Sequence, residues 1–173
     1  EEKEKKAGKS GKADKGALGG RLGVAFMHVL APLPLPVLRA LGWSIGQVLY
    51  VLAAHRRKIA LRNLELCFPQ VPQRQRRRWA RESFVAFCQT WLDRSWLWFG
   101  PRALVERRVK LQGAVQELEG DTPTIVFAPH FYGMDAGGLA LPLRTQKPFT
   151  SIFSTHPNPA IDAWLRAGRQ RFG

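Results

Sequence analysis

The sequence has few cysteines and few acidic residues. Only Cys67 and Cys88 occur in 173 residues, and they form no CxxC pair, which argues against a disulfide scaffold, a zinc ribbon and a dithiol redox centre. The four histidines share no HxxxH or HxH spacing, so no metal site is expected. No GxSxG segment marks a serine nucleophile. We expect a protein of a reducing compartment that uses no metal or other cofactor.

Positive charge is in large excess. The chain has 27 Lys and Arg against 13 Asp and Glu, which gives a formal net charge of +14 at pH 7. A partner should therefore be anionic, and a phospholipid surface, a nucleic acid and an acidic protein all qualify. Hydrophobic residues make up 45% of the chain, enough for one domain with a core.

The N-terminal third changes composition twice. Residues 1–20 alternate lysine with small residues and predict a flexible basic tail, with attraction to anionic lipid as the alternative. Residues 22–38 carry no formal charge but contain three prolines, and they are shorter than the ~20 residues that a membrane-spanning helix needs. Apolar residues then recur at helical spacing up to Leu52. We interpret residues 21–55 as an apolar membrane anchor, the alternative being an ordinary core helix.

A basic segment follows this anchor directly. Between Arg56 and Arg81, the only acidic residue is Glu65. The same segment contains nine basic residues: Arg56, Arg57, Lys58, Arg62, Arg74, Arg76, Arg77, Arg78 and Arg81. An apolar segment beside a basic one favours an anionic membrane surface over nucleic acid, because lipid binding combines burial with attraction to headgroups. The alternative is a charge run that is merely solvated.

The remaining pattern predicts an α/β fold. A helix should start near Pro72 and end near Gly100, and a second should cover Pro157–Phe172. The apolar runs Thr124–Ala128 and Phe149–Phe153 read as buried strands. We therefore expect a helical, membrane-associated N-terminal region followed, over residues 56–173, by the first part of a strand-helix domain that continues beyond this chain.

An imidazole and a carboxylate follow the first predicted strand. His130 and Asp135 are five residues apart, and Gly133 between them permits a turn that would let the carboxylate reach the ring. The carboxylate would orient the imidazole, whose other nitrogen could then act as a general base. A local hydrogen bond without catalysis is the alternative. The backbone amides of Gly137 and Gly138 are candidates for stabilising an oxyanion.

Three segments in this order resemble the bacterial lipid A biosynthesis acyltransferases, a family of lauroyl and myristoyl transferases in the lysophospholipid acyltransferase superfamily. They are the Arg62-Asn63-Leu64-Glu65-Leu66-Cys67-Phe68-Pro69 segment, the box His130-x4-Asp135 with Gly137-Gly138, and the C-terminal Gly168-Arg169-Gln170-Arg171-Phe172-Gly173. The resemblance covers about residues 22–173. It implies an O-acyltransferase at the cytoplasmic face of the bacterial inner membrane.

The resemblance also implies partners and residue roles. The donor would be an acyl carrier protein thioester and the acceptor a hydroxyl of a lipid A precursor or a related lipid. His130 would be the base, Asp135 its partner, in place of the family's frequent Glu, and Arg169 would bind phosphate or developing negative charge. His156 stands where the family often has arginine, so it would bind an anion only when protonated. The competing hypothesis is a non-catalytic basic protein that binds anionic membrane or nucleic acid.

Overall fold

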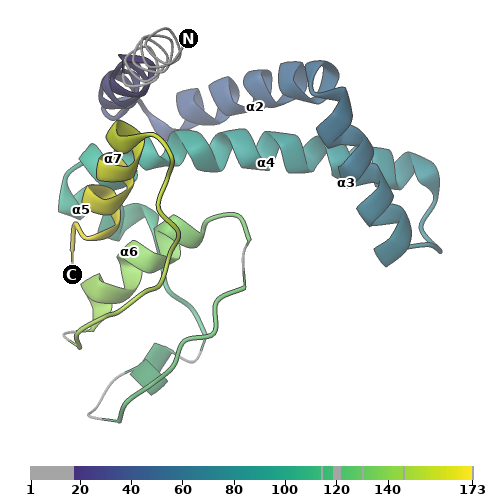
Figure 1. Cartoon of the computed structure of the whole chain (residues 1–173). Helices are drawn as coiled ribbons and strands as arrows, with labels where there is room; N and C mark the ends of the chain where they lie inside the picture. Colours follow the sequence, from purple (N-terminus) through teal and green to yellow (C-terminus); the bar gives the residue numbers. More distant parts are fainter. Residues whose placement is uncertain (1–17, 114, 119–121, 130, 146, 173) are drawn as a thin grey trace, which may run out of the picture. The chain divides into compact units, whose positions relative to one another are not determined.

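Helices account for the regular structure in the described part of the chain. The computed structural model describes residues 18–113, 115–118, 122–129, 131–145 and 147–172. The helical segment Leu18–Leu30 comes first, and the elements that follow are α2 (Leu35–Leu52), α3 (Ala54–Cys67), α4 (Gln73–Phe99), α5 (Arg102–Arg108), the 3-10 helix η1 (Val115–Leu118), α6 (Met134–Arg144) and α7 (Pro159–Arg169) (Figure 1).

The chain divides into two compact units. One consists of Leu33–Asp93, and the other consists of Arg94–Gly173 with the N-terminal segment that ends at Pro32. The first 21 residues of α4 therefore belong to one unit and its last six to the other.

In the unit Leu33–Asp93, α2 packs along α4. The close contact is made by Gly42 and Gly46, since a Cβ atom added to either would lie 2.6 Å from an atom of Gln89 or Val85 on α4. Because Gly42 faces Gln89 and Gly46 faces Val85, the two helices run antiparallel, as Figure 1 shows. Glycines four residues apart on one helix allow two backbones to approach this closely.

Prolines and a short break set the ends of these helices. Proline occupies the first turn of α2, where its missing N–H costs no intrahelical bond. Ala53 alone separates α2 from α3, and the guanidinium of Arg57 donates hydrogen bonds to the carbonyls of Tyr50 (2.6 Å) and Val51 (3.0 Å). These bonds satisfy carbonyls that the end of α2 leaves open. The backbone amides of Gln75 and Arg76 donate to the Pro72 carbonyl where α4 begins.

The unit that begins at Arg94 is built around the C-terminal end of α4. Trp98 stacks edge-to-face with Trp164 of α7, with 4.4 Å between ring centroids. The ring of His28, in the segment Leu18–Leu30, stacks on Phe99. Arg171 donates to the carbonyl of Leu97 in the last turn of α4 (2.8 Å) and to that of Gly100, which directly follows the helix. Burial of this guanidinium lowers the pKa of Arg171.

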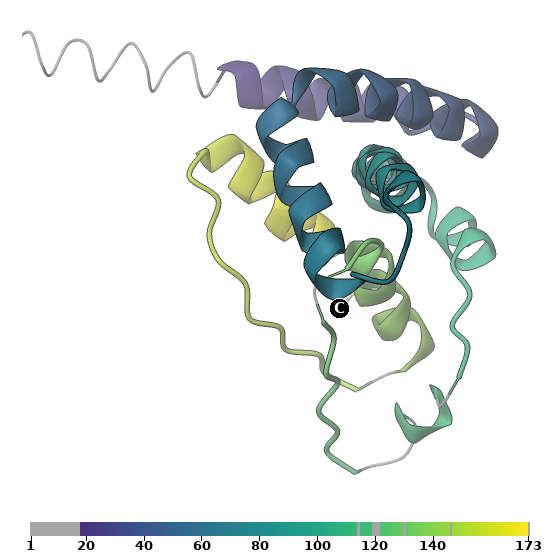
Figure 2. The same ribbon diagram turned by 90° about the vertical axis from the view of Figure 1, so that its right-hand side faces the viewer.

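The expected α/β fold is wrong for the part of the chain that the structure describes. No strand occurs in the described residues, and Thr124–Ala128 and Phe149–Phe153 lie in irregular segments, which Figure 2 draws without arrows. A buried strand needs neighbouring strands on its two edges and cover on its faces. Here Ile125 is 97% exposed and Ile152 is 100% exposed. Apolar composition alone therefore did not make these segments strands.

Three helices predicted from the sequence are present in the structure. The long helix predicted from Pro72 to Gly100 is α4, the helical repeat that ends at Leu52 is α2, and the C-terminal helix is α7, shorter than predicted at each end. The predicted tail, residues 1–20, lies outside the described residues except at its last three positions. The predicted boundaries of the anchor and the acyltransferase region stay predictions.

Candidate functional site

Asp135 lies in the first turn of α6, where the chain enters the helix through a left-handed glycine. Gly133 has φ +85° and ψ 4° and precedes the first helical residue, Met134. That conformation is open to glycine at little cost, and Gly133 forms a turn with Tyr132 directly before the helix. A carboxylate in the first turn also interacts favourably with the helix dipole.

Two arginines hold the carboxylate of Asp135. Its Oδ2 accepts a hydrogen bond from Nε of Arg94, at 2.7 Å, and its Oδ1 accepts one from Nε of Arg169, at 3.2 Å. The Asp135 side chain is only 8% exposed, and those of Arg94 and Arg169 are 17% and 28% exposed. Charge-assisted bonds of low exposure are stronger than neutral ones and fix orientation. The side chains come from three separate helices, α6, α4 and α7.

The packing of α7 explains the position of Arg169. Its neighbour Gly168 faces the indole of Trp98, and a Cβ added there would lie 2.2 Å from Trp98 Cδ2. Only a residue without a side chain lets α7 approach α4 this closely, and the approach brings Arg169 to Asp135. The guanidinium of Arg169 also lies over the ring of Phe153, 5.0 Å from its centroid, a favourable cation–π distance.

The other predicted site residues are placed as follows. His130 lies outside the described residues. The Gly137 amide donates to the Gly133 carbonyl at 3.1 Å, and Gly138 lies inside the regular helix α6, whose geometry directs its amide to the preceding turn. Both amides are thus used within the helix, and a role for Gly137 and Gly138 in stabilising an oxyanion stays a prediction.

His156 belongs to the N-terminal cap of α7. Its Nδ1 accepts a hydrogen bond from the Asn158 amide at 3.0 Å, and its own amide donates to Oδ1 of Asp162 at 2.7 Å. An accepting Nδ1 requires that this nitrogen carry no proton. In this arrangement His156 supports the turn before α7, and anion binding by its protonated form stays a prediction.

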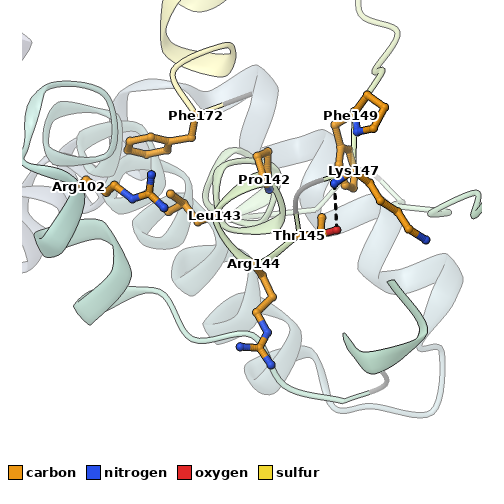
Figure 3. A pocket seen from close by; sticks show the side chains of 9 residues that line it. Arg102, Pro142, Leu143, Arg144, Thr145, Lys147, Phe149 and Phe172 are labelled. Atoms are coloured by element: carbon orange, nitrogen blue, oxygen red, sulfur yellow. Dashed lines mark hydrogen bonds between the residues drawn. The ribbon is translucent and has the colours of Figure 1, made fainter. Parts of the chain in front are cut away.

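A pocket lies at the opposite end of α6 from Asp135. It has a volume of about 580 Å³, and its lining includes three basic residues, Arg102, Arg144 and Lys147, with Pro142 and Phe172 (Figure 3). Arg102 pairs with Glu106 at 2.8 Å, and Lys147 donates to the Thr122 carbonyl at 2.8 Å. The lining residues do not include Arg94, Asp135 or Arg169, so the pocket is separate from the carboxylate site. Among the described residues no cluster of His, Cys, Asp and Glu could hold a metal ion.

Comparison with known proteins shows the family of this chain. The family model of the bacterial lipid A biosynthesis acyltransferases matches residues 15–173, and the chain belongs to that family. It is 29% identical over 154 residues to a lipid A biosynthesis lauroyltransferase of Escherichia coli, covering 87% of this chain and 49% of the relative. It is 30% identical over 156 residues to a lipid A biosynthesis palmitoleoyltransferase of the same species, with the same coverage of each chain.

A third relative is a lipid A biosynthesis acyltransferase of Haemophilus influenzae, 30% identical over 154 residues, covering 87% of this chain and 49% of the relative. The chain thus spans about half the length of the curated relatives that it matches. No solved structure gave a significant match.

Sequence reasoning missed Arg94. The sequence does contain a signal, because Asp93 and Arg94 are adjacent charges inside the aromatic run that ends α4. Charged residues in a segment that is otherwise buried need partners of opposite sign. Asp93 pairs with Arg39 at 2.6 Å and Arg94 with Asp135 at 2.7 Å. Two adjacent charges in this aromatic segment thus indicate two partners of opposite charge elsewhere in the chain.

Proposed function

We propose that the complete protein transfers a fatty acyl group from an acyl carrier protein thioester to a hydroxyl of a lipid A precursor. The observation that carries the proposal is the carboxylate of Asp135, fixed by Arg94 and Arg169 five residues after His130. Membership of the acyltransferase family supports the reaction class. The names of the relatives support lipid A precursors as acceptors.

In the proposed mechanism, His130 removes the proton from the acceptor hydroxyl. The oxygen attacks the thioester carbonyl, an O-acyl bond forms, and the carbonyl electrons return as the carbon–sulfur bond breaks. The imidazolium of His130 gives its proton to the leaving thiolate, so the products are the acylated lipid and the free thiol of the carrier. No covalent acyl-enzyme is needed.

Asp135 orients the imidazole in this proposal. Each carboxylate oxygen has two acceptor positions, so the bonds from Arg94 and Arg169 leave room for a hydrogen bond from His130. Two guanidinium groups beside one carboxylate leave a surplus positive charge. That surplus suits the oxyanion that develops on the thioester carbonyl, and Arg169 is the candidate for binding a phosphate of the acceptor.

We place the reaction at the cytoplasmic face of the inner membrane. The observation that supports membrane association is α2, an 18-residue helix with a mean hydropathy of 1.4 and most of its residues outside the core. By length and composition alone it could cross a membrane. The exposed basic residues of α3, which follows directly, suit anionic lipid headgroups.

The test uses the complete protein in detergent, a labelled acyl carrier protein thioester and a lipid A precursor, with product measured by mass spectrometry. We expect His130→Ala to lower the rate by about 10² to 10⁴ and Asp135→Asn to lower it by at least about tenfold.

Asp162→Asn is the matched control. Asp162 also lies in the first turn of a helix and pairs with an arginine, Arg166 at 2.7 Å, yet it takes no part in the proposed chemistry. Its rate should stay within about twofold of the unchanged protein. Near-normal transfer by His130→Ala would reject the mechanism. Absence of transfer by the unchanged protein, with binding to anionic vesicles retained, would favour the non-catalytic membrane-binding alternative.

A further inference from the structure

The side of α2 that faces away from α4 is apolar and exposed. Val37, Leu41, Val48 and Leu52 are all more than a third exposed, and their spacing puts them on one side of the helix. Ala40, Ser44 and Val51 complete this side. We call these seven residues the outer face of α2. It contains no charged residue along the whole helix.

The opposite side of α2 packs against α4. Leu38 is 1% exposed, and Gly42 and Gly46 bring the helix backbone against α4 with no room for a side chain. In Figure 1 the two helices lie alongside one another within the unit Leu33–Asp93. Any environment that receives the outer face of α2 must therefore accommodate α4 on its opposite side.

Charged and polar groups line the contact between α2 and α4. Arg39 donates to both carboxylate oxygens of Asp93, at 2.6 and 2.7 Å. Gln89 donates to the Arg39 carbonyl at 3.0 Å, and Arg81 donates to the side-chain oxygen of Gln47. If α2 crossed a bilayer, this part of α4 would enter the hydrocarbon core with its charges, which is costly. An orientation parallel to the membrane surface avoids that cost.

Length and charge favour the parallel orientation as well. A helix of 18 residues is about 27 Å long, shorter than the hydrocarbon core of about 30 Å. After the single residue Ala53 the chain enters α3, where Arg56, Lys58 and Arg62 are exposed. If α2 lies in the interface, it ends at the depth of the lipid headgroups. The cations of α3 then lie where they can complement anionic headgroups.

We propose that α2 lies in the plane of an anionic leaflet, with its outer face among the headgroups and upper acyl chains and with α4 on the aqueous side. This deepens the membrane association proposed above. It depends only on the unit Leu33–Asp93, so it can fail while acyl transfer stands.

The depth of α2 can be measured directly. In the complete protein, with its other cysteines including Cys67 and Cys88 replaced, single cysteines at Val37, Ser44 and Val51 would carry an environment-sensitive fluorophore. The vesicles would be phosphatidylcholine and phosphatidylglycerol at about 3:1, with lipid quenchers at a shallow or a deep acyl position. A label at Glu82 on α4 is the control and should stay unquenched.

The two orientations predict different quenching patterns. For a helix in the plane, all three labels on the outer face respond alike and more strongly to the shallow quencher. For a spanning helix, the label at Ser44 responds most to the deep quencher while Val37 and Val51 respond to the shallow one. That result would overturn the proposal and leave membrane association intact. Labels shielded without vesicles, with a dimer in analytical ultracentrifugation, would overturn it in favour of a second copy of the chain.

Two substitutions that add the same charge separate insertion from simple attraction. Val48→Asp places a carboxylate on the outer face, and Gln70→Asp places one in the exposed connection between α3 and α4. We expect Val48→Asp to weaken partition into the vesicles by about tenfold or more and Gln70→Asp to weaken it by no more than about twofold. Equal losses would mean that charge alone holds the protein to the surface, and the proposal would be rejected.

Discussion

Arg94 and Asp135, 41 positions apart in the sequence, form an ion pair with 2.7 Å between Nε and Oδ2. The pair links the last turns of α4 to the first turn of α6 within one unit. Both side chains are largely withdrawn from solvent, so the pair has a defined geometry of the kind a catalytic carboxylate requires. Arg94 is therefore a positioning residue for Asp135 in the proposed reaction.

Replacing Arg94 should lower kcat more than it changes KM. Arg94→Met removes the bond to Oδ2 and leaves Asp135 with Arg169 as its remaining described guanidinium partner. We expect kcat to fall by about tenfold or more with KM within about twofold, because orientation is lost while substrate contacts remain. Removing one partner of a poorly exposed pair should also destabilise the protein by up to about 3 kcal/mol. Steady-state kinetics with the acyl carrier protein thioester measures the first effect and chemical denaturation the second.

Two further variants show whether this effect is specific. Arg94→Lys keeps the charge but not the planar fork, so it should restore kcat only in part. Arg166→Met breaks an arginine–aspartate pair on α7 of the same length, 2.7 Å, and should leave kcat unchanged. If Arg94→Met lost stability while kcat stayed normal, Arg94 would have a structural role alone.

Gly168 should tolerate no side chain. Its Cβ would lie 2.2 Å from the Trp98 ring, so Gly168→Ala must separate α7 from α4 or displace the indole. We expect a loss of about 2–3 kcal/mol, measured by chemical denaturation. Gly23→Ala, in the helical segment Leu18–Leu30 with nothing within 4 Å of its added Cβ, should instead gain about 0.5–1 kcal/mol. A neutral Gly168→Ala would show that α7 does not pack on Trp98 in solution.

The helices were the predictable part of the fold because their signals are local. Pro72 and Gly100 bracket α4, and the apolar repeat that ends at Leu52 marks α2; each signal lies within one turn of the element it limits. The strands were predicted from apolar runs alone. Periodicity does not separate a short buried strand from another apolar segment, because a strand is defined by partners elsewhere in the chain.

The candidate site was predictable only in its local half. Spacing related Asp135 to His130 and Gly133, and the resemblance to the family added Arg169. Spacing could not reveal that Arg169 reaches Asp135, because that contact depends on how α7 packs against Trp98. Arg94 was missed because its partner lies 41 residues away. Contacts across such separations are fixed by packing and leave only indirect signs in the sequence.

The stability that Asp162 contributes should depend on pH in the acid range. The pKa of Asp162 is lowered, first by the hydrogen bond from the Arg166 side chain and next by the bond from the His156 amide. A carboxyl whose pKa is depressed by folding stabilises the protein above its unfolded pKa, and this contribution is lost as the pH falls through the folded pKa. Asp162→Asn should therefore melt at a lower temperature than the unchanged protein at pH 7, and the gap should close below about pH 4.

Arg166→Gln serves as the partner variant for this pH effect. It removes the hydrogen bond that contributes most to the lowered pKa of Asp162. In a protein that already carries Arg166→Gln, adding Asp162→Asn should lower the melting temperature at pH 7 by less than it does in the unchanged protein. A gap of the same size from pH 7 to pH 3 would mean that ionisation of Asp162 contributes nothing to stability. Thermal melts followed by circular dichroism at each pH provide the measurement.

The two cysteines should differ sharply in reactivity. Cys67 is exposed at the end of α3, whereas Cys88 is buried in α4, and burial raises the pKa of the Cys88 thiol. Since the thiolate is the nucleophile, iodoacetamide at pH 7 should modify Cys67 at least about tenfold faster than Cys88, as measured by mass spectrometry of peptides over time. In concentrated guanidinium chloride both should react at similar rates. That result would show that the folded structure causes the difference in reactivity between the two thiols. Equal rates in the native protein would place Cys88 at an accessible surface and contradict the packing of α4 described above.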